Sequence, residues 1–184
     1  MRIWPVPLSY CRTLPAPGSP GSFWEDRGDR HHCGVDIYAP KGCQVLAVDD
    51  GIILETGVFT SPEIIPYWNT TFYVIMKDSE GVIIKYAEME DILVKRGEKI
   101  TAGQLLGHVG QVLNKEAIGV SSPAYIQHLK TSDNLNMLHF EMYRALPPVT
   151  AMYLGGNTTL RNRPENLLDP GPYLQTNDIS LDQK

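Results

Sequence analysis

Short apolar runs, separated by turn-forming residues, constrain the fold of this chain more than any other feature. Its 184 residues include 16 glycines and 14 prolines. Glycine and proline interrupt helices and mark turns, so their density favours many short strands over long helices. The predicted strands are Gln44–Val48, Gly51–Leu54, Phe72–Lys77, Val82–Ala87, Gln104–Val109 and Leu138–Tyr143.

The segments between and around these strands predict other features. Residues 78–81, with the sequence Asp-Ser-Glu-Gly, predict a hairpin turn. The connection 111–136 is long enough to be functional or mobile, and within it Ser122–Lys130 predicts a short helix, because a serine cap precedes Pro123. No regular element is expected in residues 144–174. The length predicts a single domain over residues 1–184, with an irregular N-terminal wrap over 1–30 and a flexible tail over 175–184.

Composition and charge exclude several classes of protein. The chain has 16 Lys and Arg against 21 Asp and Glu, a net charge of −5, so it lacks the basic excess that nucleic-acid binding needs, and no nucleic-acid partner is expected. No apolar stretch reaches about 18 residues, so no membrane span is expected. The first residues lack the apolar core of a secretory signal peptide. The sequence assigns neither a compartment nor an oligomeric state.

Two clusters carry side chains of the kinds that bind metals. His32 and Asp36 are four residues apart, around Gly34, in a loop that enters a strand. Such a pair can converge on one metal ion, and zinc takes both imidazole nitrogen and carboxylate oxygen. In the second cluster, His139 and Glu141 point to one face of their predicted strand, because side chains alternate along a strand. Neither cluster alone distinguishes a metal ligand from a structural histidine.

A third stretch, Val94–Gly107, predicts a strand and turn. In this order the three clusters resemble the lysostaphin-like zinc metallopeptidases, which cut peptide bonds in bacterial cell-wall peptidoglycan. The family pattern HxGxD is present at residues 32–36, and its KxGxxVxAGQxIG pattern corresponds to residues 95–107. The opening Trp-Pro-Val-Pro at 4–7 and the ending at 169–174 are also similar to the family, so the resemblance spans about residues 4–174.

The resemblance implies a fold and a cofactor. The implied fold is all-β, with a largely antiparallel sheet of the lysostaphin type (the duplicated hybrid motif) and a groove that holds the metal. The implied cofactor is Zn²⁺, with His32, Asp36 and His139 as ligands. Three protein ligands leave a fourth position open, which is the pattern of a catalytic zinc site. The loops Val58–Thr71 and Gln111–Asn136 are expected to form the groove walls.

Two positions depart from the family pattern. The family has a histidine in a YxH segment, where this chain has Glu88, and a first histidine in HxHFE, where this chain has Met137. Glutamate is the general base of other zinc peptidases, so Glu88 is a predicted catalytic residue, whereas methionine cannot transfer a proton. His128 lies in the long connection before His139 and is the second predicted catalytic residue, in place of the lost imidazole.

Two functions are consistent with these residues. The first is a zinc-dependent metallo-endopeptidase that acts on peptide cross-links of bacterial cell-wall peptidoglycan, with catalysis impaired by the two substitutions. The alternative is a catalytically silent zinc-binding scaffold or regulator that binds cell-wall peptides or a protein partner. Peptidoglycan peptides, or another peptide substrate, are the expected partners, and the family suggests a periplasmic, cell-surface or secreted protein.

Overall fold

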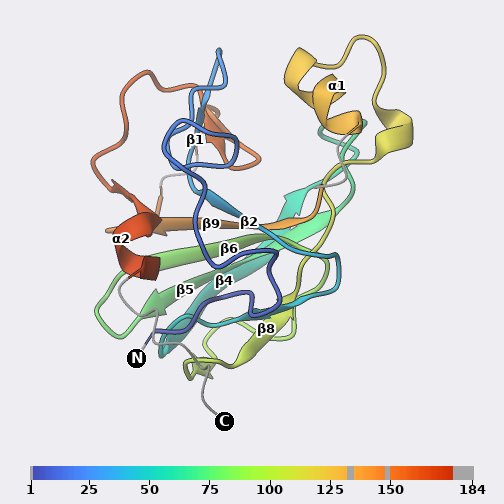
Figure 1. Ribbon diagram of the computed structural model, residues 1–184. Helices are drawn as coiled ribbons and strands as arrows, with labels where there is room; N and C mark the ends of the chain where they lie inside the picture. Colours follow the sequence, from blue (N-terminus) through green and yellow to red (C-terminus); the bar gives the residue numbers. More distant parts are fainter. Residues whose placement is uncertain (1, 132–134, 148–149, 176–184) are drawn as a thin grey trace.

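The computed structural model describes residues 2–131, 135–147 and 150–175, without the side chains of residues 124, 125 and 128. Strands β9, β6, β5 and β4 cross the middle of the molecule in Figure 1. The elements are β1 (His31–His32), β2 (Val35–Tyr38), β3 (Gln44–Leu46), β4 (Gly51–Thr60), β5 (Thr71–Asp78), β6 (Ile83–Met89), β7 (Lys99–Ile100), β8 (Leu105–His108), a 3₁₀ helix (Lys115–Ala117), α1 (Ala124–Lys130), β9 (Met137–Tyr143), β10 (Tyr153–Leu154), β11 (Asn157–Thr158), β12 (Leu167–Leu168) and α2 (Pro170–Gln175). The expected all-β, largely antiparallel fold is confirmed.

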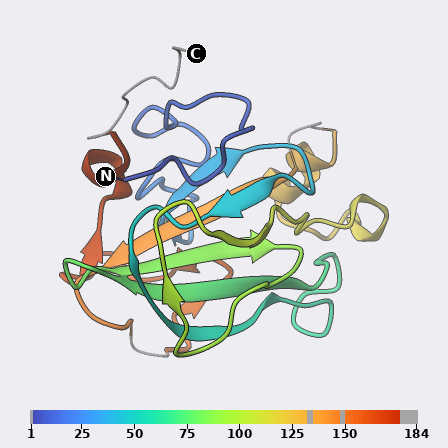
Figure 2. The ribbon, with the colours of Figure 1, turned by 90° about the horizontal axis from the view of Figure 1, so that it is seen from below.

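One sheet forms the centre of the molecule. Its strand order is β12-β9-β6-β5-β4-β7, and β2 pairs with β9 on the same side as β12. Figure 2 shows the strands of this sheet from below. The predicted hairpin turn joins β5 to β6, and Oδ1 of Asp78 accepts hydrogen bonds from the backbone N–H groups of Glu80 and Val82. These bonds to an aspartate side chain explain why the polar segment turns so tightly.

The two faces of the central sheet differ in chemistry. On β9, Leu138 and Phe140 pack into the main hydrophobic core, and alternation turns His139 and Glu141 to the opposite face. All four side chains are at most 2% exposed. The second face is therefore polar and buried at the same time, which is costly unless every polar group there finds a partner.

Two loops pack on each other beside the sheet. Trp68 forms an isolated antiparallel bridge with Leu113, and Gln111 forms one with Asn136, so the long connection begins and ends at the same place. The predicted helix is present there as α1, two residues shorter at its start than expected. The buried apolar side chains that these loops share are Trp68, Val112, Leu113, Ile118, Ile126 and Leu135.

Two predictions about individual elements are wrong. The sequence predicts a loop from Val58, but β4 continues to Thr60, because its pairing with β5 resumes after two register shifts. The sequence also predicts irregular chain over 144–174, where the structure has the β10–β11 hairpin, β12 and α2. These elements are two to six residues long, too short for a periodic pattern to reveal them.

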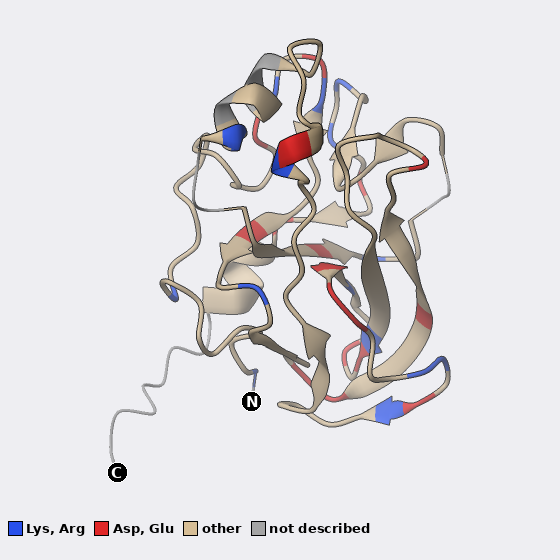
Figure 3. Ribbon diagram, turned by 90° about the vertical axis from the view of Figure 1, so that its right-hand side faces the viewer, with Lys and Arg blue, Asp and Glu red and all other residues tan. Residues whose placement is uncertain are grey.

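Within the described residues, no helix combines the length and the apolar character that crossing a membrane requires. In the view of Figure 3, segments with Lys and Arg are scattered among segments with Asp and Glu. The single-domain boundaries and the absence of a nucleic-acid partner stay predictions.

Replacement of Gly34 by alanine is expected to lower the free energy of unfolding by about 2 kcal/mol. The added Cβ would collide with the backbone carbonyl oxygen of Phe140 and crowd the side chains of His139 and Glu141, so β2 would have to move away from β9. Urea unfolding of Gly34→Ala and wild type measures the difference. Gly119→Ala is the matched control, because its added Cβ comes no closer than 4.0 Å to a neighbouring atom. Equal effects of the two substitutions would contradict this explanation.

Candidate metal centre

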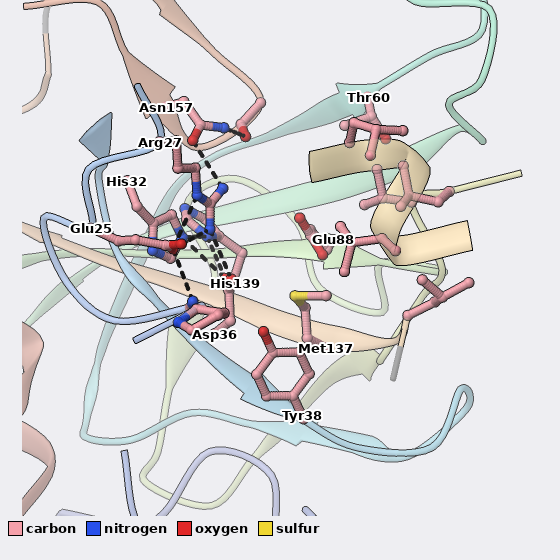
Figure 4. Close-up of a pocket in the computed structure, with 18 of the residues that line it drawn as sticks. Glu25, Arg27, His32, Asp36, Tyr38, Thr60, Glu88, Met137, His139 and Asn157 are labelled. Atoms are coloured by element: carbon pink, nitrogen blue, oxygen red, sulfur yellow. Dashed lines mark hydrogen bonds and ion pairs between the residues drawn. The ribbon is translucent and has the colours of Figure 1, made fainter. Parts of the chain in front are cut away.

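Three buried side chains from β1, β2 and β9 converge on one point. Nε2 of His32 lies 2.9 Å from Nδ1 of His139, and Oδ1 of Asp36 lies 3.1 Å from the first atom and 3.0 Å from the second. Each side chain belongs to a residue that is at most 5% exposed. Figure 4 shows the three residues together at one side of a cavity. The structure thus brings the three predicted ligands into one group.

Backbone pairing explains why these atoms meet. Asp36 and His139 are directly opposite in the β2–β9 ladder, which puts their side chains on one face at neighbouring positions. His32 precedes β2 in the short strand β1, and Gly34 allows the chain between these ligands to cross close to β9. The β10–β11 turn closes over the site, because Gly156 (φ 77°) lies so close to His139 that an added Cβ would be 2.6 Å from its Nε2.

Hydrogen-bond acceptors hold the outer nitrogen of each imidazole ring. Nδ1 of His32 lies 2.8 Å from the carbonyl oxygen of Ser22, and Nε2 of His139 lies 2.7 Å from Oε1 of Glu141. Although burial opposes protonation, hydrogen bonds with Asp36 and Glu141 raise the pKa of His139 to about 9, so without a metal ion this ring is protonated and donates to both carboxylates. A metal ion in place of the inner proton would be held by one lone pair from each inner nitrogen and by Oδ1 of Asp36.

The donor set and its spacing fit zinc. Zinc binds imidazole nitrogen and carboxylate oxygen at about 2.0–2.2 Å in tetrahedral geometry, which places neighbouring ligand atoms roughly 3.3 Å apart. The separations of 2.9–3.1 Å between the inner atoms are close to that value. His32, Asp36 and His139 would hold the ion, and a fourth position would remain for water or substrate.

Glu141 is the centre of a buried network behind His139. Its carboxylate accepts hydrogen bonds from the hydroxyls of Tyr143 and Tyr153, each at 2.5 Å, and Nζ of Lys85 lies 3.8 Å from its Oε2. Burial by itself would raise the pKa of Glu141, but the charge of Lys85 and hydrogen bonds from His139 and Tyr143 hold that pKa well below its ordinary value. An ionised carboxylate here would orient the His139 ring toward a metal ion held at this centre.

The sequence places Glu141 on the face of His139 but assigns it no role. The sequence does not reveal that Lys85, from β6, and Tyr153, from β10, contact the carboxylate of Glu141. Nζ of Lys85 also donates a hydrogen bond to the Tyr153 hydroxyl at 2.6 Å. A lysine within an apolar strand is the one sequence signal that points to a buried acidic partner.

A bulge in β6 turns Glu88 toward the same cavity. Ile84 and Tyr86 pack into the main core, and strict alternation would send Glu88 there too. The pairing with β5 shifts register at this point, however, and Met89 takes the core position instead. Glu88 has φ 63°, in the left-handed region that residues with a side chain seldom adopt. Strained backbone of this kind is concentrated at functional sites.

The carboxyl of Glu88 is not fully paired. Its Oε2 is buried and has no hydrogen-bond partner in the described part of the chain. Burial, and secondly the negative charge of Asp36, raises the pKa of Glu88 to about 8. Glu88 and Met137 line the cavity across from His32 and Asp36 (Figure 4). Glu88 is therefore suited to accept a hydrogen bond from a ligand or a water beside the metal centre.

The cavity has a volume of about 390 Å³ and two unlike sides. Near the ligands it is charged: Nη2 of Arg27 lies 2.9 Å from Glu25 and 3.5 Å from Oδ2 of Asp36. The other side is formed by the two loops that the sequence predicts as groove walls. Its apolar lining residues are Trp68, Val112, Leu113, Ile126, Leu129 and Leu135. This combination of volume, apolar lining and a few polar groups is typical of small-molecule and peptide sites.

The other three histidines, His31, His108 and His128, lie in different parts of the chain. His128, the second predicted catalytic residue, belongs to α1, but its side chain lies outside the described residues, so its role stays a prediction. His31 points away from the ligands and stacks on Trp24, with ring centroids 4.5 Å apart. Nδ1 of His108 pairs with Asp91 at 2.9 Å. The structure therefore separates His31 and His108 from the metal centre.

Residues 30–151, well over half of the chain, match the model of peptidase family M23. The chain belongs to peptidase family M23. The matched residues of this M23 chain include His32, Asp36, Glu88 and His139, so family membership and the geometry of the centre concern the same part of the molecule.

Several individual proteins are similar to this M23 chain. Peptidoglycan DD-endopeptidase ShyC of Vibrio cholerae is 32% identical over 79 residues, which cover 43% of this chain and 16% of ShyC. The uncharacterized lipoprotein YgeR of Escherichia coli is 30% identical over 110 residues, which cover 58% of this chain and 39% of YgeR. The chain thus spans less than half the length of these curated relatives. The catalytic domain of lysostaphin from Staphylococcus simulans has a TM-score of 0.48 at 20% identity, over 79% of this chain and 80% of that domain.

Purified M23 chain is expected to bind about one zinc ion per molecule, and His139→Ala is expected to lose it, because two remaining ligands do not hold zinc tightly. Elemental analysis after zinc loading and dialysis measures the content. His108→Ala, which removes a histidine outside the centre, should retain the metal. Zinc-free wild type after loading, or zinc retained by His139→Ala, would show that the three side chains do not bind it together.

Substitution of Glu141 by glutamine is expected to weaken zinc binding about 10–100-fold, because the neutral amide no longer orients and polarises the His139 ring as the carboxylate does. Competition with a chromophoric chelator measures the dissociation constant. Glu63→Gln, on the exposed loop after β4, is the control for loss of one negative charge. The same affinity in Glu141→Gln and wild type would contradict the role of this hydrogen bond.

Proposed function

We propose that this chain is a zinc-dependent metallo-endopeptidase that hydrolyses peptide cross-links of bacterial cell-wall peptidoglycan. The proposal rests on one observation: three convergent ligand atoms and the incompletely paired carboxyl of Glu88 border the same cavity. Membership of a peptidase family supports peptide hydrolysis, and the name of the relative ShyC supports peptidoglycan as the substrate. Zinc, when bound, would acidify a water molecule and polarise a peptide carbonyl.

In this mechanism Glu88 is the general base. Its carboxylate would accept a proton from the attacking water and pass it to the amine that leaves when the peptide bond breaks. Burial alone favours the protonated form of Glu88, which cannot accept a proton. A cation held by the neighbouring ligands favours the ionised form, so zinc binding and the readiness of Glu88 to act as a base are coupled.

Other residues of the cavity would position the reacting groups. Arg27 contacts Oδ2 of Asp36 and Oε2 of Glu25, which leaves Oδ1 of Asp36 directed at the two histidines. The apolar side of the cavity, which includes Trp68 and Leu129, would hold the peptide chain beside the metal and exclude water around it. Exclusion of water strengthens the electrostatic interactions that stabilise the transition state.

Met137 favours the alternative function, a catalytically silent zinc-binding scaffold or regulator. It lines the cavity at the position where the family pattern has a histidine, and its thioether is a weak acceptor that cannot transfer a proton. A silent relative would retain zinc and bind cell-wall peptides without cleaving them. The two functions therefore differ in turnover and not in metal content.

Glu88→Gln is expected to lower kcat at least about 100-fold while zinc content stays at the wild-type level, because the amide cannot accept the proton of the attacking water. The assay incubates zinc-loaded protein with purified peptidoglycan and separates the released peptides by liquid chromatography and mass spectrometry. Glu90→Gln changes an exposed carboxylate two residues further along the chain and is the matched control.

Each outcome of this assay has a separate meaning. Zinc-loaded wild type without any cleavage would reject the peptidase and support the silent scaffold. Equal turnover of Glu88→Gln and wild type would reject Glu88 as the base while leaving the peptidase function intact. The same assay on His128→Ala tests the second catalytic residue that the sequence predicts, with a loss of turnover expected.

A further inference from the structure

Tyr38 stands beside the ligand pair on the same face of the sheet. In the β2–β9 ladder, Asp36 is opposite His139, and two positions further along Tyr38 is opposite Met137. Residues two apart on a strand point to the same face, so these four side chains form two neighbouring cross-strand pairs. All four line the one cavity. The register of the two strands therefore places a phenol next to the metal centre.

The hydroxyl of Tyr38 is directed into the cavity. Figure 4 shows its oxygen turned toward the ligands, close to the side chain of Met137. A Cβ added to Gly21 would lie 2.9 Å from the hydroxyl oxygen of Tyr38 and 3.2 Å from Oδ2 of Asp36. The two oxygens thus border the same small space at the edge of the centre.

Other donors around the ligands are already engaged. Arg27 donates to Glu25 and Asn157, the side-chain amide of Asn157 donates to a backbone carbonyl, and the hydroxyl of Thr60 does the same. Within the described residues, no hydrogen bond from the hydroxyl of Tyr38 is found. A phenol is protonated at neutral pH and can donate one hydrogen bond. Tyr38 therefore offers the cavity a donor that the fold itself does not use.

We propose that the Tyr38 hydroxyl donates a hydrogen bond to the substrate's carbonyl oxygen as that oxygen gains negative charge during hydrolysis. The inference rests on the proposed peptidase function. The O–H bond of Tyr38 stays intact throughout, since the proton of the attacking water goes to Glu88 and then to the leaving amine. Met137, the cross-strand neighbour, has no hydrogen to donate, so Tyr38 supplies the stabilisation that this end of the cavity otherwise lacks.

Tyr38→Phe tests the inference, because it removes the hydroxyl and keeps the ring. Loss of one such donor lowers kcat by about 10²–10³-fold in other hydrolases, so a fall of about 100-fold with little change in KM is expected on peptidoglycan. Zinc content should be unchanged. Tyr10→Phe, at a tyrosine that is 57% exposed, is the matched control and should behave as wild type.

A binding experiment separates this inference from the proposed function. The probe is a phosphinic analogue of Ala–Ala, whose PO₂⁻ group resembles the charged tetrahedral species. Acetohydroxamate, which binds zinc without resembling that species, is the reference ligand. Tyr38→Phe on zinc-loaded protein is expected to weaken phosphinate binding at least about 10-fold, since a hydrogen bond to a charged group is lost, and to leave acetohydroxamate binding unchanged.

The outcomes are distinct. Weaker phosphinate binding by Tyr38→Phe supports the hydrogen bond even where the wild type hydrolyses nothing, and in that case the proposed function alone is rejected. Equal phosphinate binding by Tyr38→Phe and wild type overturns the inference, whatever the rates of hydrolysis. Failure of the zinc-loaded wild type to bind the phosphinate overturns it as well.

Discussion

The antiparallel pairing of β2 with β9 is the constraint on which the candidate site depends. It sets Asp36 opposite His139 across a separation of 103 residues in the chain, and the same register sets Tyr38 opposite Met137. A slip of one residue would turn each of these side chains to the other face of the sheet. The apolar neighbours Leu138 and Phe140 prevent such a slip, because they would have to leave the main core. Burial of one face therefore determines the chemistry of the other.

The polar face is stable because its charges are compensated by specific partners. A buried ionised group without a partner costs several kcal/mol, and this face buries Asp36 and Glu141 together. Glu141 is compensated by Lys85 and by two tyrosine hydroxyls, and Asp36 by Arg27. The inner nitrogens of the two histidines lie within 3.1 Å of Oδ1 of Asp36. The fold thus supplies partners for the buried charges around the centre. The centre itself, with two imidazoles and a carboxylate, is suited to bind a cation.

The resemblance to the family implies that the chain keeps the metal ligands and differs in the groups around them. Glu88 and Met137 occupy positions where the resemblance implies imidazoles, and neither side chain can serve as a cationic hydrogen-bond donor. The structure shows what accompanies these changes: a backbone bulge that turns the Glu88 carboxyl into the cavity, and the Tyr38 hydroxyl beside Met137. In the proposed mechanism a carboxylate would accept the proton and a phenol would donate a hydrogen bond to the developing charge, in place of two histidines.

The sequence by itself determined the strand-rich class, the β5–β6 turn, the helix of the long connection and the three side chains that converge at the candidate metal centre, since each depends on local residue patterns or on family motifs within a few residues. The tertiary structure alone decided the rest. Glu88 enters the cavity because a bulge breaks alternation, Lys85 reaches Glu141 because β6 lies beside β9, and Tyr38 faces Met137 through strand register. The two-residue strand β11 pairs with the distant strand β1 as well as with its hairpin partner β10. These features depend on which segments lie side by side, and the free energy that decides this comes from burial of the whole core rather than from any local pattern.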